Sequence, residues 1–459
     1  MGFWAKDVFS PTGRNTSPAI VPTPAMSLAN STVKLDYAQL SDVGMRRANN
    51  QDSLTTVVAP DAEIWRQRGH LLMVADGMGA HAAGELASKL AVDNVPHTYY
   101  KLSQMASPGA LRQAVRQANE VIHDKGQNSI DFQGMGTTCT CLVLVPQGAL
   151  VAHVGDSRAY RLRNNCLEQL SFDHSLVWET AAASQLPEES LSTVIPKNVI
   201  TRSLGPHEAV NVDLEGPFDV QQGDVFLVCS DGLSGQVTDE EIGTIIGCVS
   251  PQHAAQTLID LANLRGGPDN ISVIVARVED APASTVSATK QATSAGKPAA
   301  HPLSPWAWLM MFAWVALLAV SGWNRWIWGV LIGLAGFGTT VAISFLQRLH
   351  PSSNEPVTEL AGPYGNGPYR TFDCTPGRGV VDALAEIAGQ LRELPQQEGW
   401  AVDMDWSAID AHQKQALQAV DRADWRTAIS EFCHIIRITM QQLRERRATV
   451  TTQTGIRLD

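Results

Sequence analysis

The stretch LLMVADGMGAHAAGE, residues 71–85, carries the clearest structural signal in the chain. Its apolar beginning predicts a short buried strand that delivers Asp76 to its carboxyl end. Gly77 and Gly79 predict a turn, and a helical pattern follows from Ala82. A carboxylate beside a glycine carbonyl suits a hard divalent cation such as Mg²⁺ or Mn²⁺. Taken alone, the stretch equally fits a strand-to-helix turn in which Asp76 caps the helix.

Length and composition narrow the choice of protein class. The chain has 459 residues, which is enough for about two or three domains with a sizeable core. The net charge of −12 and the lack of clustered Lys and Arg argue against a nucleic-acid partner. Seven cysteines are scattered, apart from Cys139 and Cys141 in a strand-like run. We therefore expect core thiols in a reducing compartment, not a disulfide framework.

Residues 33–280 predict one folded domain of mixed strands and helices. Helix-like patterns stand before and after a group of closely spaced strand-like segments, which favours an α+β layered domain over a regular βαβ sheet. The helix-like segments are SKLAVDNVPHTYYKL, ALRQAVRQANEVI and the regions 239–247 and 251–264, and the strand-like segments are VKLDYAQL, GTTCTCLVLV, ALVAHVGD, SRAYRLR, DVFLVCSD and ISVIVARV.

Two long apolar runs predict a membrane hairpin over residues 304–347. Each run approaches the length that crosses a bilayer, Asn324 and Arg325 form the turn, and tryptophans stand at the expected interfaces. A hairpin places both flanking regions on one side of the membrane. The basic residues outside the turn favour the cytoplasmic side, which predicts a multi-pass protein of the cytoplasmic membrane.

The other segments divide the chain further. Residues 1–32 have the composition of a disordered arm, and residues 281–303 that of a linker. A linker rich in Pro and Gly is expected over 348–379, followed by a small α-helical domain over 380–459. Within that domain the helical pattern breaks near residues 421–424 and resembles one tetratricopeptide-type helix pair, although a single copy does not establish a repeat.

Four further aspartates share the local design of Asp76. Asp52 follows a polar turn, Asp156 lies between two strand-like segments, Asp231 follows DVFLVCS, and Asp269 precedes the last strand. Side chains at strand ends can meet on one rim of a layered domain, where several carboxylates repel one another and raise each other's pKa values. Divalent ions remove that penalty, and an oxygen-only set selects Mg²⁺ or Mn²⁺ over Zn²⁺. Each aspartate singly also fits a turn or a helix cap.

Taken together, the motifs resemble those of the bacterial metal-dependent serine/threonine protein phosphatases of type 2C. The matching pieces are GMRRANNQDS, VADGMGAHAAGE, GMGTTCTCLVL, HVGDSRAYRL, NVITRSLG, CSDGL and GGPDNISV, which span the whole of the first domain. The resemblance implies a four-layer α-β-β-α sandwich with a dinuclear Mn²⁺ or Mg²⁺ centre at one end. It also implies hydrolysis of phosphoserine and phosphothreonine by a water that the two ions activate.

The resemblance assigns metal ligands by position. Asp76 would bridge the two ions, and the Gly77 carbonyl would bind the first. Asp231 and Asp269 would bind the second ion. Asp156 and Asp231 match the ligands of a third ion that bacterial members bind.

It also implies the roles of Arg47 and Asp52. Arg47 would grip the substrate phosphate, for which a planar, permanently charged guanidinium is well suited. Asp52 would join Asp76 in the catalytic centre and count among the residues of the metal site, by supporting the water that the metals hold. Two positions depart from the family pattern: Gln51 replaces a glutamate, and Met78 replaces a histidine proposed as the acid in animal relatives. The proton donor is therefore open, with His81 or a water as candidates.

The expected function is a membrane-tethered protein phosphatase in signal transduction. Its partners would be proteins phosphorylated on Ser or Thr, including a Ser/Thr kinase. The alternative is a catalytically weak phosphatase-fold sensor or scaffold that signals through the C-terminal helical domain. Filled ligand positions favour the enzyme.

Overall fold

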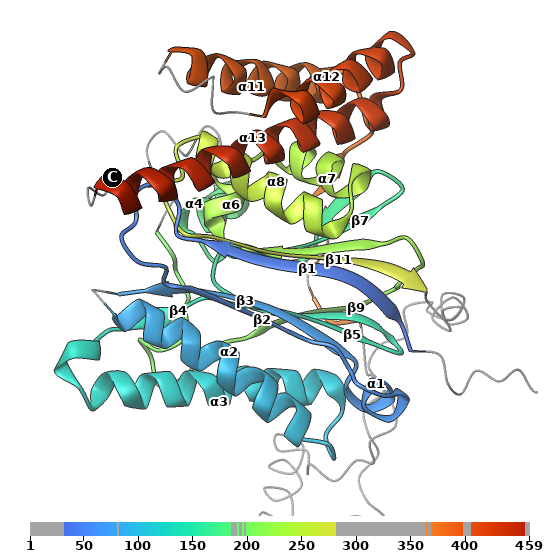
Figure 1. The fold of residues 1–459 in the computed structure, drawn as a ribbon. Coiled ribbons are helices and arrows are strands. Elements are labelled where there is room, and N and C mark those ends of the chain that lie inside the picture. The colour runs from blue at the N-terminus through green and yellow to red at the C-terminus, as the bar shows by residue number, and fades with distance from the viewer. Residues whose placement is uncertain are drawn as a thin grey trace, which may run out of the picture.

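The computed structural model describes residues 32–79, 82–184, 191, 195–196, 199–280, 363–365, 367, 369–397 and 405–454. Two antiparallel β-sheets stack face to face at its centre, and helices cover the outer face of each sheet (Figure 1). This is the α-β-β-α sandwich that the sequence predicts.

The strands of both sheets pair antiparallel throughout the described part of the chain. The first sheet has the order β1 (Lys34–Asp42), β11 (Ile271–Asp280), β10 (Val225–Cys229), β7 (Arg158–Arg163), β8 (Cys166–Gln169) and β12 (Thr371–Asp373). The second has the order β2 (Asp52–Val57), β3 (His70–Met78), β5 (Cys139–Val145), β6 (Gly148–Val154) and β9 (Asp213–Phe218), with β4 (Gly136–Thr137) paired to the end of β3.

The helices fall into two sets on opposite sides of the sandwich, together with shorter pieces at its ends (Figure 1). The second sheet is covered by α2 (Ala83–Lys101) and α3 (Ser107–Gln127), and the first by α7 (Asp239–Cys248) and α8 (Pro251–Leu264). The shorter pieces are α1 (Ala62–Arg68), the 3₁₀ turn η1 (Ile130–Phe132), α4 (Leu176–Ser184) and α6 (Asp231–Ser234).

The position of β3 explains why residues 71–75 are all apolar and do not alternate between apolar and polar residues. Leu71 and Met73 pack against α2 and α3, whereas Leu72 and Val74 point into the core between the two sheets. Successive strand residues face opposite sides, so a strand buried on both faces needs apolar residues at every position. All four side chains are fully buried.

The C-terminal region packs on the two-sheet domain, on top of α7 and α8 (Figure 1). It consists of α11 (Arg378–Gln397), α12 (Trp406–Asp421) and α13 (Trp425–Thr454), and the break that the sequence predicts near residues 421–424 separates the last two. Buried Phe432 and Ile436 of α13 share one apolar core with α8. Strand β12 lies inside the region 348–379, which the sequence assigns to a linker. The strand was not predicted because three residues are too few to show a strand pattern, and its pairing with β8 is known only from the structure.

Candidate metal centre

Strands β2 and β3 bring the first two predicted acids face to face. Their antiparallel register sets Asp52 directly opposite Asp76. The sequence predicts a strand that ends before Asp76, whereas β3 continues through Gly77 to Met78. The difference has a physical cause, since β4 pairs with this extension and the Asp76 carbonyl accepts from the backbone N–H of Thr138 at 2.8 Å. Asp76 is therefore held within a ladder and not on a free turn.

The other three acids come from the ends of strands in the two sheets. Asp156 lies in the turn between β6 and β7, Asp231 begins α6 directly after β10, and Asp269 stands just before β11. These acids lie close enough to influence one another: the charge of Asp231 raises the pKa of Asp76 and of Asp156, and the charge of Asp269 raises the pKa of Asp231. The structure thus gathers all five predicted acids at one end of the sandwich.

Several oxygens of this acidic cluster have no hydrogen-bond partner. Oδ1 of Asp52, of Asp156 and of Asp231 are all buried and unpartnered. Burial, followed by repulsion from the neighbouring carboxylates, raises the pKa of Asp76 well above its ordinary value. Burial also raises the pKa of Asp52 to about 7, although hydrogen bonds from Ser272 and Ser230 oppose the shift. Buried carboxylates with free lone pairs need a counter-charge from outside this set.

A hard divalent cation fits that requirement. Among the described residues, no group of three or more His, Cys, Asp and Glu side chains has the spacing of a finished metal site. The unpartnered oxygens and mutual repulsion of the aspartates nevertheless match the donor type that Mg²⁺ and Mn²⁺ prefer. The residues present therefore suit divalent ions in their chemistry.

Arg47 lies beside this cluster. Its Nη2 donates to Oδ2 of Asp269 at 2.7 Å, and the side chain is 49 % exposed. The hydrogen bond that Arg47 donates to Asp269 is the main cause that raises the pKa of Arg47, with the charges of Asp76 and Asp231 adding to it. A guanidinium anchored by one edge at an acidic rim retains other N–H groups for an incoming anion.

Asn270 organises the loop that carries Arg47, a role that sequence reasoning did not assign. Its Nδ2 donates to the backbone carbonyls of Val43 at 2.9 Å and Asn49 at 3.0 Å, and its Oδ1 accepts from the N–H of Gln51 at 2.8 Å. The amide therefore ties the segment before β2 to the start of β11. Its place directly after Asp269 in GGPDNISV was the available signal.

Ser230 is a second supporting residue that the sequence did not single out. Its hydroxyl donates to Oδ2 of Asp52 at 2.8 Å and accepts from the N–H of Ser272 at 3.0 Å. It thereby joins β2, β10 and β11 at the point where their acids meet. The serine is adjacent to Asp231, so its position in VCSDG could have suggested it.

Gln51 and Gly77 meet at the entrance to α2. Nε2 of Gln51 donates to the carbonyl of Gly79 at 3.3 Å, and the carbonyl of Gln51 accepts from the N–H of Gly77 at 3.2 Å. A Cβ on Gly77 would lie 2.1 Å from the carbonyl oxygen of Gly84. Only glycine permits this approach of helix and strand, and the requirement is independent of any ligand role of the Gly77 carbonyl.

Four predictions fall outside the described residues. They concern His81 as a proton donor, the membrane hairpin at 304–347, the linker at 281–303 and the disordered arm at 1–32, of which only residue 32 is described. In the part of the chain that the structure describes, none of the helices has the length and apolar character needed to cross a bilayer.

Comparison with known protein families shows what the folded domain is similar to. The protein phosphatase 2C model matches residues 45–261, and a second model, the tryptophan-associated transmembrane protein, matches residues 274–362. A putative protein phosphatase 2C-type from Streptococcus pyogenes is 38 % identical over 246 residues, which cover 52 % of this chain and 96 % of that protein. The chain belongs to the protein phosphatase 2C family.

Two further similarities involve a mycobacterial relative. The serine/threonine protein phosphatase PstP of Mycobacterium tuberculosis is 36 % identical over 258 residues, which are 55 % of this chain and 47 % of that relative. The solved catalytic domain of PstP, described as a complex with two manganese ions, is 36 % identical, with 54 % of this chain and all of that chain covered and a TM-score of 0.46.

Proposed function

We propose that residues 33–280 hydrolyse phosphoserine and phosphothreonine in proteins with the help of divalent ions. Family membership makes the chain a serine/threonine protein phosphatase. The observation that carries the residue-level proposal is the cluster of five buried or half-buried aspartates with unpartnered oxygens beside an arginine. Such a cluster is poorly suited to structural support, because its like charges oppose folding unless cations neutralise them.

The aspartates would hold the ions. Asp76, Asp231 and Asp269 form the inner set, and Asp52 and Asp156 flank it. Bound Mn²⁺ or Mg²⁺ would neutralise phosphoryl oxygens and activate a water molecule for attack on phosphorus. The Gly77 carbonyl, next to Asp76 on β3, is the proposed main-chain ligand. A third ion on Asp156 and Asp231 is part of this proposal.

Arg47 would bind and orient the phosphoryl group. Its permanent charge and planar set of donors match two phosphate oxygens at once. The ion pair with Asp269 holds the guanidinium at the rim, so a substrate phosphate would exchange for, or share, that contact. Asn270 fixes the backbone of the loop on either side of Arg47, which reduces the entropy lost when the phosphate is bound.

We further propose that the enzyme is held at the cytoplasmic face of the membrane by residues 304–347. The apolar runs of the sequence and the match of residues 274–362 to a transmembrane family model support a tether. Its substrates would be proteins phosphorylated on Ser or Thr, including a Ser/Thr kinase.

A metal titration of the full chain tests the catalytic proposal. Turnover of a phosphothreonine peptide should stop when metals are chelated and return with excess Mn²⁺. Asp231→Asn should lower turnover about a hundredfold or more at saturating Mn²⁺, since one inner ligand is lost. Asp280→Asn, an exposed aspartate at the end of β11, is the matched control and should stay near wild type. Full activity in chelator, or in Asp231→Asn, would refute the metal mechanism.

A further inference from the structure

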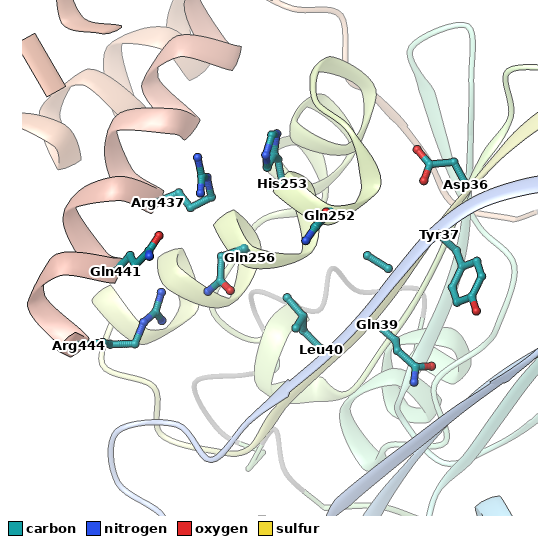
Figure 2. A pocket seen from close by; sticks show the side chains of 11 residues that line it. Asp36, Tyr37, Gln39, Leu40, Gln252, His253, Gln256, Arg437, Gln441 and Arg444 are labelled. Carbon is teal, nitrogen blue, oxygen red and sulfur yellow. The ribbon is translucent and has the colours of Figure 1, made fainter. Parts of the chain in front are cut away.

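A cavity of about 600 Å³ lies between β1, α8 and α13 (Figure 2). Its wall on one side is the run Asp36–Leu40 in the middle of β1, and its opposite wall is formed by α13 of the C-terminal region. It is separate from the acidic cluster, which lies beyond the end of β1. Because α13 supplies Arg437, Gln441 and Arg444, the cavity exists only while the C-terminal helices are docked.

Arg437 is the residue in this wall that lacks a counter-charge. None of the ion pairs or hydrogen bonds within the described part of the chain includes its guanidinium, and its Nε is buried without an acceptor. A buried donor without a partner costs free energy, and more when it is charged. This cost makes Arg437 the group in the cavity with most to gain from an added acceptor.

The other charged groups around the cavity are paired, neutral or on its far wall. Arg444 pairs with the buried Asp260 of α8 at 2.7 Å, so those two charges cancel. His253 of α8 faces the cavity, and burial followed by the charge of Arg437 lowers its pKa, which keeps the ring neutral. Asp36 lines the far wall on β1, where its carboxylate is exposed. On the side formed by α8 and α13, the charge without a partner is therefore that of Arg437.

The donors surround the cavity from two elements. Arg437 and Arg444 project from α13, and the amide of Gln252 projects from α8 (Figure 2). Donors on two helices can share the several oxygens of a phosphate group, and arginine binds phosphate oxygens in pairs. The volume also exceeds what one small anion needs, which leaves room for the rest of a ligand.

We propose that this cavity binds a small ligand that carries a phosphate group, with its phosphate oxygens on Arg437 and its remainder between β1 and α8. The ligand would bridge the C-terminal helices and the phosphatase domain. The site uses none of the groups assigned to hydrolysis, so it stands whether or not the catalytic roles proposed above are correct.

The structure also provides a route from this site to Arg47. Helix α8 runs from the cavity to Asn263, whose Nδ2 donates to Oδ1 of Asp42 at 3.1 Å. The same oxygen accepts from the N–H of Gly44 at 2.9 Å, at the start of the loop that carries Arg47. A ligand that fixes α13 against α8 would thereby steady this loop.

The test measures binding, not turnover. The full chain carrying Arg47→Gln, which weakens any phosphate contact at the acidic cluster, is titrated calorimetrically in chelator with inorganic phosphate and with glycerol phosphate. Adding Arg437→Gln should weaken binding about tenfold or more, because charge-assisted hydrogen bonds are lost. Arg422→Gln, which removes an exposed charge at the end of α12, is the control and should leave binding unchanged.

Three outcomes decide the proposal. Loss of phosphate binding in Arg437→Gln but not in Arg422→Gln supports it and identifies a soluble ligand. Binding that depends on Arg437 only for vesicles containing phosphatidic acid, and not for plain phosphatidylcholine vesicles, supports the same phosphate chemistry with a lipid headgroup as its source. Binding that is absent, or equal with and without Arg437, overturns it. If Arg437→Gln fails to fold by circular dichroism, Arg437→Lys, which keeps the charge but loses the planar donors, takes its place.

Discussion

A cluster of five buried or half-buried aspartates and one fully buried aspartate have opposite surroundings in this protein. The acidic cluster gathers five aspartates. In the described residues, the only arginine in direct contact with them is Arg47, which touches Asp269 alone. On the other side of the first sheet, Asp260 is fully buried, and its Oδ2 has no hydrogen-bond partner, but its Oδ1 pairs with Arg444 from α13 and accepts from Gln256. The first set needs a partner from solution, whereas the second has one within the chain. Charge that a fold leaves unbalanced therefore marks the site of chemistry, and charge that it balances marks an internal contact.

The largest effect should follow from removing an acid of the unbalanced set. Asp76→Asn should lower peptide turnover on the order of a thousandfold, because it removes the proposed bridging ligand. In the metal-free chain the same change should raise the midpoint of thermal unfolding, because one repulsive buried charge is gone. Calorimetry in chelator and a turnover assay in Mn²⁺ measure the two effects.

Destabilisation of the metal-free chain by Asp76→Asn would contradict this contrast, since it would mean that the aspartate supports the fold. Asp280→Asn serves again as the exposed control.

The docking of α13 can be tested through its apolar contacts. Phe432→Ala should lower the free energy of unfolding by about 3 kcal/mol, since a buried aromatic side chain in the core shared with α8 is replaced by a cavity. Leu417→Ala is the control, because that side chain on α12 is 53 % exposed and should change stability little. Denaturant titration measures both, and equal effects would show that α13 is not part of the core.

Removal of Arg444 should lower the stability of the protein, whereas removal of the Asp76 carboxylate should raise the stability of the metal-free chain. Arg444→Gln leaves Asp260 buried without its cation and should cost about 2 kcal/mol at neutral pH, less than a fully buried pair because Arg444 is 40 % exposed. Burial raises the pKa of Asp260 to about 6, although Arg444 opposes the shift. The folded state therefore takes up a proton, and stability from this group falls as the pH rises through a window from about 4 to about 6.

The loss caused by Arg444→Gln should accordingly be larger at about pH 8 than at about pH 5, where protonated Asp260 no longer needs the guanidinium. Lys414→Gln removes an exposed charge from α12 and provides the control. A loss that is independent of pH would show that Arg444 acts by packing alone.

The smallest expected effect concerns Gln51, which stands where the family pattern has a glutamate. Gln51→Glu adds a carboxylate next to the acidic cluster and should lower the Mn²⁺ concentration that gives half-maximal turnover by about threefold to tenfold. It should also destabilise the metal-free chain slightly by adding to the repulsion. An unchanged Mn²⁺ requirement would show that the side chain at position 51 does not reach the ions. The hydrogen bond from Gln51 to the Gly79 carbonyl is compatible with that result.

The aspartates could be selected from sequence because each stands where a strand ends, and strand ends share a rim. What sequence could not supply was register. That Asp52 faces Asp76 depends on how β2 pairs with β3, and that β3 extends through Met78 depends on β4, a strand of two residues from a distant segment. The roles of Asn270 and Ser230 likewise arise from contacts between segments far apart in the chain.

The packing of the C-terminal helices on α8 could not be predicted from the sequence for a related reason. The apolar face of α8 is explained by the sheet beneath it, so the pattern of residues 251–264 gives no sign that α13 packs against the same helix. Strand β12 is too short to be recognised before its pairing with β8 is known. Helix periodicity, in contrast, is local, and it located α12, α13 and the break between them.

The position of β12 has a mechanical consequence for any membrane attachment. The chain leaves the first sheet at the end of β11 and rejoins that sheet at β12, and on the way back Tyr364 exchanges backbone hydrogen bonds with Gly216. A tether within the intervening segment would suspend the domain from two points and not from one. Two-point suspension restricts swivelling, so the rim that carries Arg47 would keep a limited range of tilts toward the bilayer surface.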